Sequence, residues 1–235
     1  MYTLQELDGS PQHRITYRLP DLYRHLSNIN SSFRIHATPS FHGPPARPDL
    51  LPAYVPSLES QILVLEIDSS VILVVDMVIF SKQAIQSETP VVVPWSHWGP
   101  QYTWCFLHDG NNSISVFGSK MAYALPLDHT PAPGELSKGK SDEEGNFYVH
   151  IWDFNRRITA RAKNADGRNC SDPVIRKPGR IIHWPFVEDY ITSNRLYTAT
   201  VCHTPFTANR FHKLFLDQDR LILSWVGTSV YEYIP

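Results

Sequence analysis

One segment of the sequence has the spacing of a phosphate-binding loop. Residues 134–141 read Gly-Glu-Leu-Ser-Lys-Gly-Lys-Ser, which fits the pattern G-x-x-x-x-G-K-[ST]. Such a loop binds phosphates only between a buried strand and the N-terminus of a helix. Here Pro131 and Pro133 stand where the strand should end, and the acidic run Asp142–Glu144 and Gly145 stand where the helix should begin. The sequence therefore favours a polar loop over a nucleotide site, and we predict no cofactor.

The remaining reactive residues indicate neither a metal site nor a catalytic nucleophile. The chain has 11 His and 3 Cys, but none of the H-x-x-x-H, HExxH or CxxC spacings that bring ligands to one metal ion. It also has no G-x-S-x-G elbow, the turn that exposes a catalytic serine. Cys105 lies between Trp104 and Phe106, as is typical of a small buried side chain. We therefore predict no metal and no local catalytic motif.

An aromatic cluster is the most distinctive local feature. The segment Pro94–Trp104 reads PWSHWGPQYTW. Its Pro and Gly residues predict a loop, and Trp and Tyr dominate the hot spots of protein interfaces. The candidate protein-binding residues are therefore Trp95, His97, Trp98 and Tyr102. The alternative is that the rings fill the core, which the surrounding strand pattern favours for Trp104.

Composition narrows the class of protein. The 235 residues include 21 Lys and Arg and 23 Asp and Glu, for a net charge of −2. This balance provides no general attraction for nucleic acid or an anionic membrane. Met1–Pro20 has no apolar run of signal-peptide length, and the apolar run Ile62–Phe80 is interrupted by three acidic residues. We therefore expect a cytoplasmic or nuclear protein without nucleic-acid or membrane partners.

The elements that must position these residues are predicted to be strands. Proline makes up 19 of the 235 residues, which argues against a helical bundle. Six prolines lie between Ile35 and Ser57, so residues 1–60 are expected to be an N-terminal segment with a Pro-rich extended strap, followed by a β-rich domain over 61–235. A hairpin is predicted around Asp109–Asn112, and a short helix over Thr207–Leu216. The strands are predicted at Ile62–Ile67, Val71–Phe80, Tyr102–Leu107, Ser113–Phe117, Met121–Leu125, Phe147–Trp152, Arg157–Arg161, Arg180–Trp184, Leu196–Cys202, Arg220–Val226 and Ser229–Ile234.

Several of these strands end in a hydrophobic–acidic–hydrophobic triplet. The clear cases are centred on Asp76, Asp153 and Glu232, and weaker ones lie at Gly118 and Asp189. Together these positions are separated by steps of 42, 35, 36 and 43 residues, close to the ~40–45 residues of a four-stranded propeller blade. The alternative is an all-β sandwich or irregular barrel, which would also have strands at short intervals.

A family resemblance points in the same direction. Residues 148–155, with the sequence YVHIWDFN, resemble the third strand of a WD40-type blade. The phrases FRIHATPSFHGPP, SQILVLEI, MAYALPL and VHIWDFN resemble the region that follows the F-box in fungal, basidiomycete-type F-box proteins. Such proteins are substrate-selecting arms of ubiquitin ligases. Leu19-Pro20 matches the opening of an F-box, but the prolines from Pro39 onward interrupt its helices, so we expect the F-box itself to be absent.

Taken together, the sequence predicts an all-β fold. Its expected form is an irregular or incomplete β-propeller-like array of antiparallel strands with a Pro-rich N-terminal strap. The predicted function is protein–protein recognition, and the resemblance implies the substrate-selecting part of an F-box-type ubiquitin-ligase adaptor. The alternative that stays open is a hydrolase-like enzyme whose site is assembled from distant strands.

Overall fold

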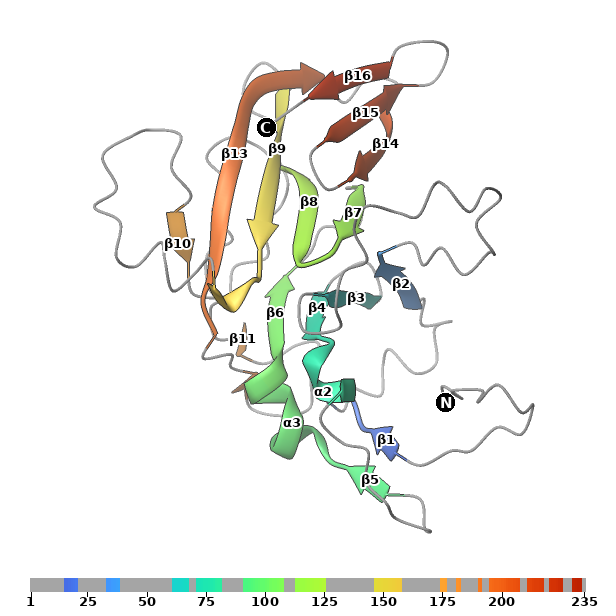
Figure 1. The fold of residues 1–235 in the computed structure, drawn as a ribbon, viewed down its shortest axis with the longest axis vertical. Helices are drawn as coiled ribbons and strands as arrows, with labels where there is room; N and C mark the ends of the chain where they lie inside the picture. The colour runs from blue at the N-terminus through green and yellow to red at the C-terminus, as the bar shows by residue number, and fades with distance from the viewer. Residues whose placement is uncertain are drawn as a thin grey trace, which may run out of the picture.

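Antiparallel β-sheets form most of the structure, which confirms the all-β fold class (Figure 1). The computed structural model describes residues 15–20, 33–38, 61–67, 71–81, 91–107, 113–125, 146–157, 174–176, 181–182, 190–191, 195–207, 211–217, 220–225 and 230–233. The described strands are β1 (Ile15–Tyr17), β2 (Phe33–Ala37), β3 (Ile62–Ile67), β4 (Val71–Asp76), β5 (Val91–Val93), β6 (Thr103–Leu107), β7 (Ile114–Phe117), β8 (Lys120–Leu125), β9 (Asn146–Asp153), β10 (Val174–Arg176), β11 (Ile181–Ile182), β12 (Tyr190–Ile191), β13 (Tyr197–Thr207), β14 (Phe211–Leu216), β15 (Leu221–Trp225) and β16 (Val230–Tyr233). The described helices are α2 (Val78–Ser81) and α3 (Trp95–Tyr102).

Three antiparallel sheets hold most of the strands. Sheet 1 has the strand order β2-β3-β4-β6, sheet 2 has the order β10-β13-β9-β8-β7, and sheet 3 has the order β14-β15-β16. In sheets 1 and 2 the first three strands follow one another as a meander, and a fourth strand then adds beside the third. Two short pairings lie outside these sheets, with β1 parallel to β5 and β11 antiparallel to β12.

Strand β4 lies at the centre of sheet 1 because its sequence is apolar on both faces. It reads VILVVD, and all six residues are buried. Ile72 and Val74 face the core shared with sheet 2, whereas Leu73 and Val75 face the core on the other side. A continuous apolar run of this kind is expected of a strand that is covered on both faces.

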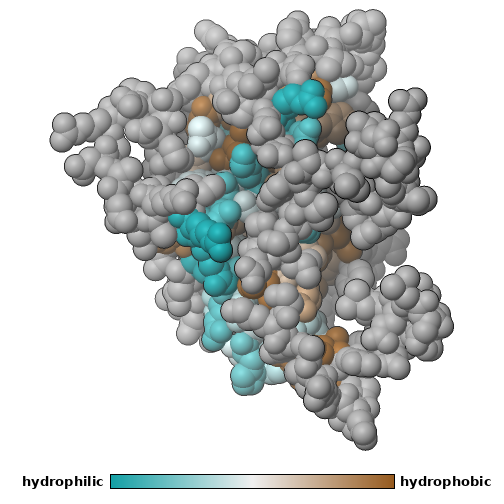
Figure 2. All heavy atoms as spheres, viewed as in Figure 1, coloured by the Kyte–Doolittle hydropathy of each residue, from teal (hydrophilic) through white to brown (hydrophobic). Residues whose placement is uncertain are grey.

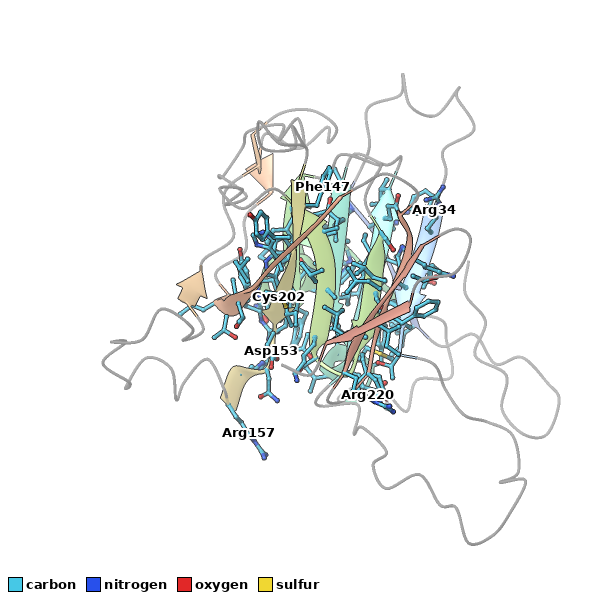
Figure 3. The ribbon with its side chains drawn as sticks, turned by 90° about the horizontal axis from the view of Figure 1, so that it is seen from above. Arg34, Phe147, Asp153, Arg157, Cys202 and Arg220 are labelled. Atoms are coloured by element: carbon cyan, nitrogen blue, oxygen red, sulfur yellow. The ribbon has the colours of Figure 1, made fainter. Side chains whose placement is uncertain are left out.

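The core between sheets 1 and 2 is rich in aromatic rings. Trp104 and Phe106 of β6 pack in it with Trp152 of β9, with Phe154 and with Tyr197 of β13. The ring centroids of Phe106 and Trp152 are 4.8 Å apart, as are those of Trp104 and Phe154. Such aromatic pairs contribute about 0.5–1.5 kcal/mol each beyond the area that they bury. Seen from above, the side chains fill the spaces between the strands (Figure 3).

Two further cores cover the outer faces of these sheets. On sheet 1, the second core joins strand residues such as Leu73 to α3. On sheet 2, the third core joins small residues such as Ala122 to Leu214 of sheet 3. The Oγ atoms of Ser113 and Ser115 accept hydrogen bonds from the backbone N–H groups of Leu214 at 3.1 Å and Leu216 at 2.8 Å. These serines therefore connect β14 to the edge of sheet 2.

The hairpin predicted around Asp109–Asn112 does not form. Strand β6 pairs with β4 in sheet 1, whereas β7 pairs with β8 in sheet 2. Asp109–Asn112 themselves lie outside the described residues. Local turn chemistry indicates where a chain can reverse, but long-range packing decides which strands pair.

The helix predicted over Thr207–Leu216 is also wrong. The residues Phe211–Leu216 form strand β14, in which Leu214 and Leu216 are buried while Lys213 and Phe215 are exposed. This alternation has the period of two that belongs to a strand with one covered face. Antiparallel pairing of β14 with β15 stabilises the segment as a strand rather than as a helix.

Other boundaries differ by a few residues. The predicted strand Val71–Phe80 ends at Asp76, where α2 follows after one turn residue. The segment Trp95–Tyr102 is a helix rather than a loop. Of the strand predicted at Arg157–Arg161 only Arg157 is described, and β9 already has β8 and β13 as its two neighbours.

The first sixty residues contribute strands to the sheets. Strand β2 pairs with β3 in sheet 1, and β1 pairs with β5. The Pro-rich segment is predicted over Ile35–Ser57, but Ile35–Ala37 belong to β2. The rest of this segment, from residue 39, and the loop with phosphate-binding spacing at 134–141 lie outside the described residues.

Candidate functional site

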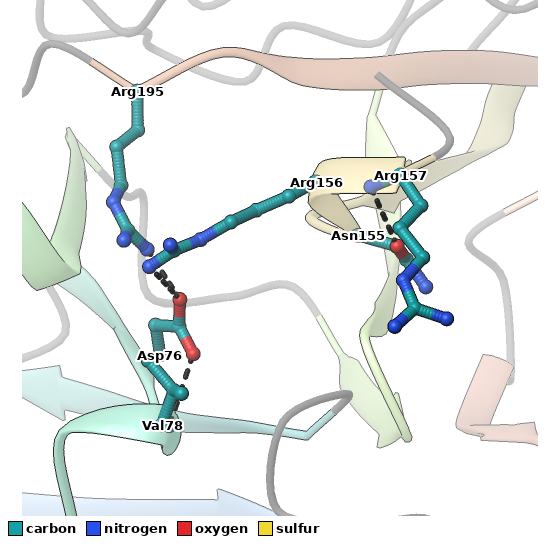
Figure 4. A network of polar contacts seen from close by, with 6 residues as sticks. All are labelled: Asp76, Val78, Asn155, Arg156, Arg157 and Arg195. Atoms are coloured by element: carbon teal, nitrogen blue, oxygen red, sulfur yellow. Dashed lines mark hydrogen bonds and ion pairs between the residues drawn. The ribbon is translucent and has the colours of Figure 1, made fainter. Parts of the chain in front are cut away.

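The ends of several elements meet at a buried carboxylate, that of Asp76 (Figure 4). Asp76 is the last residue of β4 and is 6% exposed. Its Oδ1 accepts the backbone N–H of Val78 at 3.0 Å, which turns the chain from β4 into α2. Its Oδ2 accepts hydrogen bonds from Arg156 Nη2 at 2.9 Å and from Arg195 Nη1. A buried charge is costly unless it is paired, and these two guanidinium groups compensate the carboxylate.

The two arginines differ in their surroundings. The Arg195 side chain is only 16% exposed, and its guanidinium carbon lies 5.3 Å from the ring centroid of Tyr102 and 5.0 Å from that of Trp104. Cation–π contacts of this kind are stronger when the cation is shielded from water. The Arg156 side chain is 55% exposed. Both guanidinium groups contact Oδ2 of this carboxylate, and that of Arg156 is the one exposed to solvent.

A turn built on Asp153 positions Arg156. Asp153 ends β9, and its Oδ1 accepts hydrogen bonds from Ser119 Oγ at 2.7 Å and from the Asn155 N–H at 2.9 Å. Asn155 Oδ1 in turn accepts the N–H of Arg157 at 2.9 Å. Side chains of Asp and Asn that bond the backbone two residues on are typical turn formers. As a result Arg156 reaches Asp76, while the Arg157 side chain extends away from it (Figure 4).

The Trp104 indole lies beneath this cluster. The residue is 1% exposed, and its Nε1–H has no acceptor among the described residues. A buried donor without a partner costs about 1–3 kcal/mol. Packing of the large ring against Phe154 and the Arg195 guanidinium offsets this cost.

The structure places the candidate residues of α3 in two different environments. Trp95 and Trp98 are each 4% exposed, and their ring centroids are 5.0 Å apart. Trp98 Nε1–H donates to the carbonyl oxygen of Arg18 at 2.9 Å. A Cβ at Gly99 would lie 2.3 Å from Trp95 Cε2, so only glycine permits this close packing. Both indoles therefore belong to the second core, and a partner cannot contact their rings in this arrangement.

The other two candidate residues are accessible. His97 is exposed, and Tyr102 is partly buried beneath the Arg195 guanidinium. Tyr102 therefore joins α3 to the cluster around Asp76. Binding by α3 stays a prediction, and its exposed side chains are the ones that would carry it.

Exposed polar side chains from α3 and the end of β9 occupy one face of the molecule. Figure 2 shows hydrophilic residues gathered over the end of β9 and along α3. We name this the β9–α3 surface. Its exposed residues are Ser96, His97, Gln101, Arg156 and Arg157. They come from two segments far apart in the sequence. The end of β9 packs in the aromatic core between sheets 1 and 2, whereas α3 packs in the second core.

A second buried carboxylate lies on β3. Glu66 is 3% exposed, and its carboxylate lies 3.6 Å from Arg34 Nη1 and 3.2 Å from His36 Nε2. Both partners are on β2, where Arg34 is opposite Glu66 and His36 is opposite Val64. This contact joins the polar side chains of β2 to β3.

The described residues contain no cluster of His, Cys, Asp and Glu that could hold a metal ion. Burial raises the pKa of Cys202 to about 11 and also raises that of Cys105. These thiols are therefore poor sources of a thiolate nucleophile. Burial, and then the nearby Tyr102, raise the pKa of Tyr17, whose hydroxyl donates to the Ile79 carbonyl oxygen at 3.4 Å. The hydrolase-like alternative stays a prediction.

Sequence reasoning missed the cluster as a unit. Asp76 was recognisable as an acid at the end of an apolar run, and Arg156 as part of a basic segment. Nothing local distinguishes Arg195, because its partner lies 119 positions away. The one available signal was the position of an acid at a strand end in a run that is otherwise apolar.

Compared with family models, curated proteins and solved structures, the chain matches none of them. Among the residues that the structure describes, no helix has the length and apolar character needed to cross a membrane.

Proposed function

We propose that this chain is a propeller-like protein-recognition module and that the β9–α3 surface contacts its partner. The observation that carries the proposal is the convergence of exposed Arg156 and Arg157 with exposed residues of α3 on one rigid face. Arginine and tyrosine are enriched where proteins bind one another. A guanidinium that is already oriented by Asp76 loses little conformational freedom on binding.

The arrangement of the sheets supports the propeller-like part of the proposal. Sheets 1 and 2 repeat the same meander and pack face to face through a shared core, and sheet 3 packs on the next face. The blades of a propeller are also antiparallel sheets stacked on one another, so this arrangement is compatible with the proposal. We further propose, from the family resemblance in the sequence, that the partner is a protein selected for a ubiquitin ligase.

Affinity capture from a fungal lysate, with quantitative mass spectrometry, tests both parts. The wild-type chain is compared with the double variant His97→Glu, Arg157→Glu, whose side chains are exposed. Lys213→Glu, on the outer face of β14, is the matched charge control because Lys213 is also exposed. We expect a discrete set of proteins, including ligase subunits, that is captured by the wild type and the control and lost by the double variant.

Two results would contradict the proposal. Equal capture by all three folded proteins would show that the β9–α3 surface is not the contact. A discrete, surface-dependent partner set without any ubiquitin-ligase component would overturn the adaptor role and leave the recognition role in place.

A further inference from the structure

Strand β2 forms one edge of sheet 1. It pairs antiparallel with β3 over its whole length, from Phe33 opposite Ile67 to Ala37 opposite Leu63. None of the described strands pairs with its other edge. An edge strand presents unpaired backbone N–H and C=O groups, and natural proteins commonly protect such edges with charges, prolines or covering segments.

The apolar face of β2 is unusually accessible. Phe33 is 45% exposed and Ile35 is 47% exposed. They are two of the five large hydrophobic side chains that are exposed among the described residues. Their cross-strand neighbours Ile67 and Leu65 are buried in the second core. The apolar surface of sheet 1 therefore continues outward to its edge and is exposed there.

The opposite face of β2 carries the Arg34 guanidinium. The Arg34 side chain is 63% exposed, and it shares the single carboxylate of Glu66 with His36. Figure 3 places Arg34 at the periphery of the stacked sheets, well apart from Arg157. The exposed guanidinium can therefore bind a second carboxylate from a neighbouring strand.

Three successive exposed residues, Phe33, Arg34 and Ile35, form the first half of β2. Beyond the strand, Thr38 Oγ1 accepts the backbone N–H of Gly118 at 2.7 Å, and the carbonyl oxygen of Gly118 accepts the N–H of Ile62 at 2.9 Å. These bonds attach the end of β2 to the turn between β7 and β8. A strand added to β2 would therefore lie beside Phe33, Arg34 and Ile35.

We infer that the outer edge of β2 binds an extended segment of a partner protein as an additional strand of sheet 1. The backbone of the segment pairs with β2, as in other cases of strand addition. Two of its apolar side chains, at alternate positions, pack beside Phe33 and Ile35. An acidic side chain between them faces Arg34. This inference goes beyond the proposed function, because it names a second surface and the chemistry of the segment that it takes.

A second copy of the same chain fits this edge poorly. Strand β2 reads FRIHA and contains no acidic residue. Pairing of two β2 strands would therefore leave Arg34 without a carboxylate opposite it, and the register that places Phe33 opposite Ile35 would bring the two Arg34 side chains together. Directly opposed like charges destabilise a strand pair, so charge favours an acidic partner segment over self-association.

Selection from a displayed library of random twelve-residue peptides tests the inference on the full chain. We expect enriched peptides with an apolar–acidic–apolar core. The binding of a fluorescently labelled copy of the most enriched peptide should weaken at least tenfold with Ile35→Lys. The wild type should bind the acidic peptide more tightly than an analogue in which the acidic residue of the peptide is replaced by its amide. The Arg34→Gln variant should bind the two peptides about equally.

Phe215→Lys is the matched control, since Phe215 is an exposed apolar residue on a different sheet. It should leave peptide binding unchanged, and thermal unfolding should show that all variants are folded. Enrichment of peptides without alternation, equal binding to Ile35→Lys, or no enrichment on folded protein would overturn the inference. So would a dimer in sedimentation that Ile35→Lys dissociates. None of these variants alters the β9–α3 surface, so this test and the capture experiment fail independently.

Discussion

Asp76 and Asp153 occupy equivalent positions in two different sheets. Each is the last residue of the third strand of its sheet, β4 in sheet 1 and β9 in sheet 2. Each Oδ1 accepts the backbone N–H of the residue two positions further on, at 3.0 Å from Val78 and 2.9 Å from Asn155. The same kind of hydrogen bond, from a backbone N–H to the Asp side chain, therefore ends both strands and turns the chain after each of them.

The two carboxylates are also parts of one assembly. The turn at Asp153 places Arg156, and Arg156 reaches back to Asp76 in the neighbouring sheet. The turn in one sheet therefore supplies the counter-charge for the turn in the other. We therefore expect that substitution of either carboxylate changes the position of Arg156 on the β9–α3 surface.

Replacing Asp76 by Asn should destabilise the fold by about 3 kcal/mol, because removing one partner of a buried ion pair leaves the other charge uncompensated. The amide oxygen can still accept the Val78 N–H, so the loss reports the charge rather than the turn. Urea unfolding measures the effect. Asp217→Asn is the control, since Asp217 and Arg220 form an exposed pair with side chains 49% and 53% exposed, for which a loss below about 1 kcal/mol is expected. Equal losses in the two variants would contradict the role given to Asp76.

Replacing Asp153 by Ala should cost about 2–3 kcal/mol, since two hydrogen bonds to a buried carboxylate are lost. Ser119→Ala removes only one of these bonds and should cost about 1 kcal/mol. Asn155→Ala removes an exposed bond to the Arg157 N–H and serves as the control, with a smaller loss. If the three variants unfold at the same urea concentration, the carboxylate does not organise this turn.

Replacing Trp152 by Ala should destabilise the fold by about 3–5 kcal/mol, the usual range for a large aromatic removed from a core. Trp152 is 2% exposed, and its ring centroid lies 4.8 Å from that of Phe106 and 5.6 Å from that of Tyr197. Phe215→Ala is the control, because its side chain is 46% exposed and its loss should change stability by less than about 1 kcal/mol. An unchanged urea midpoint for Trp152→Ala would show that the ring does not join sheets 1 and 2.

The thiol of Cys202 should make stability fall at high pH. Burial raises its pKa from 9.0 to about 11, so the folded state keeps the thiol proton where the unfolded state has lost it. Its contribution to stability is therefore complete below about pH 9 and is lost as the pH rises toward 11. Urea unfolding of the wild type and of Cys202→Ala, compared across this range, isolates the effect. The wild type should lose more stability than the variant, and parallel curves would contradict the prediction.

The sequence pattern predicted some of the acidic residues near strand ends correctly. Asp76, Asp153 and Glu232 lie on the third strand of sheets 1, 2 and 3 respectively, at steps of 77 and 79 positions by their residue numbers. The shorter steps predicted through Gly118 do not hold, because Gly118 has φ 58° and lies in the turn between β7 and β8. Asp189 lies outside the described residues. An aromatic or apolar residue beside an acid marks a strand end, but a turn between the first two strands has a similar local appearance.

By itself the sequence determined the class of fold and the places where most strands run. Apolar runs such as Val71–Asp76 and the alternation in Ile114–Phe117 specify strands, because strand formation depends on the period of local side chains. Only the tertiary structure decided that β6 joins β4, that the indoles of Trp95 and Trp98 are buried, and that Arg195 pairs with Asp76. These outcomes depend on which distant surfaces exclude water together and which buried charges must be compensated, and neither condition is encoded in a local pattern.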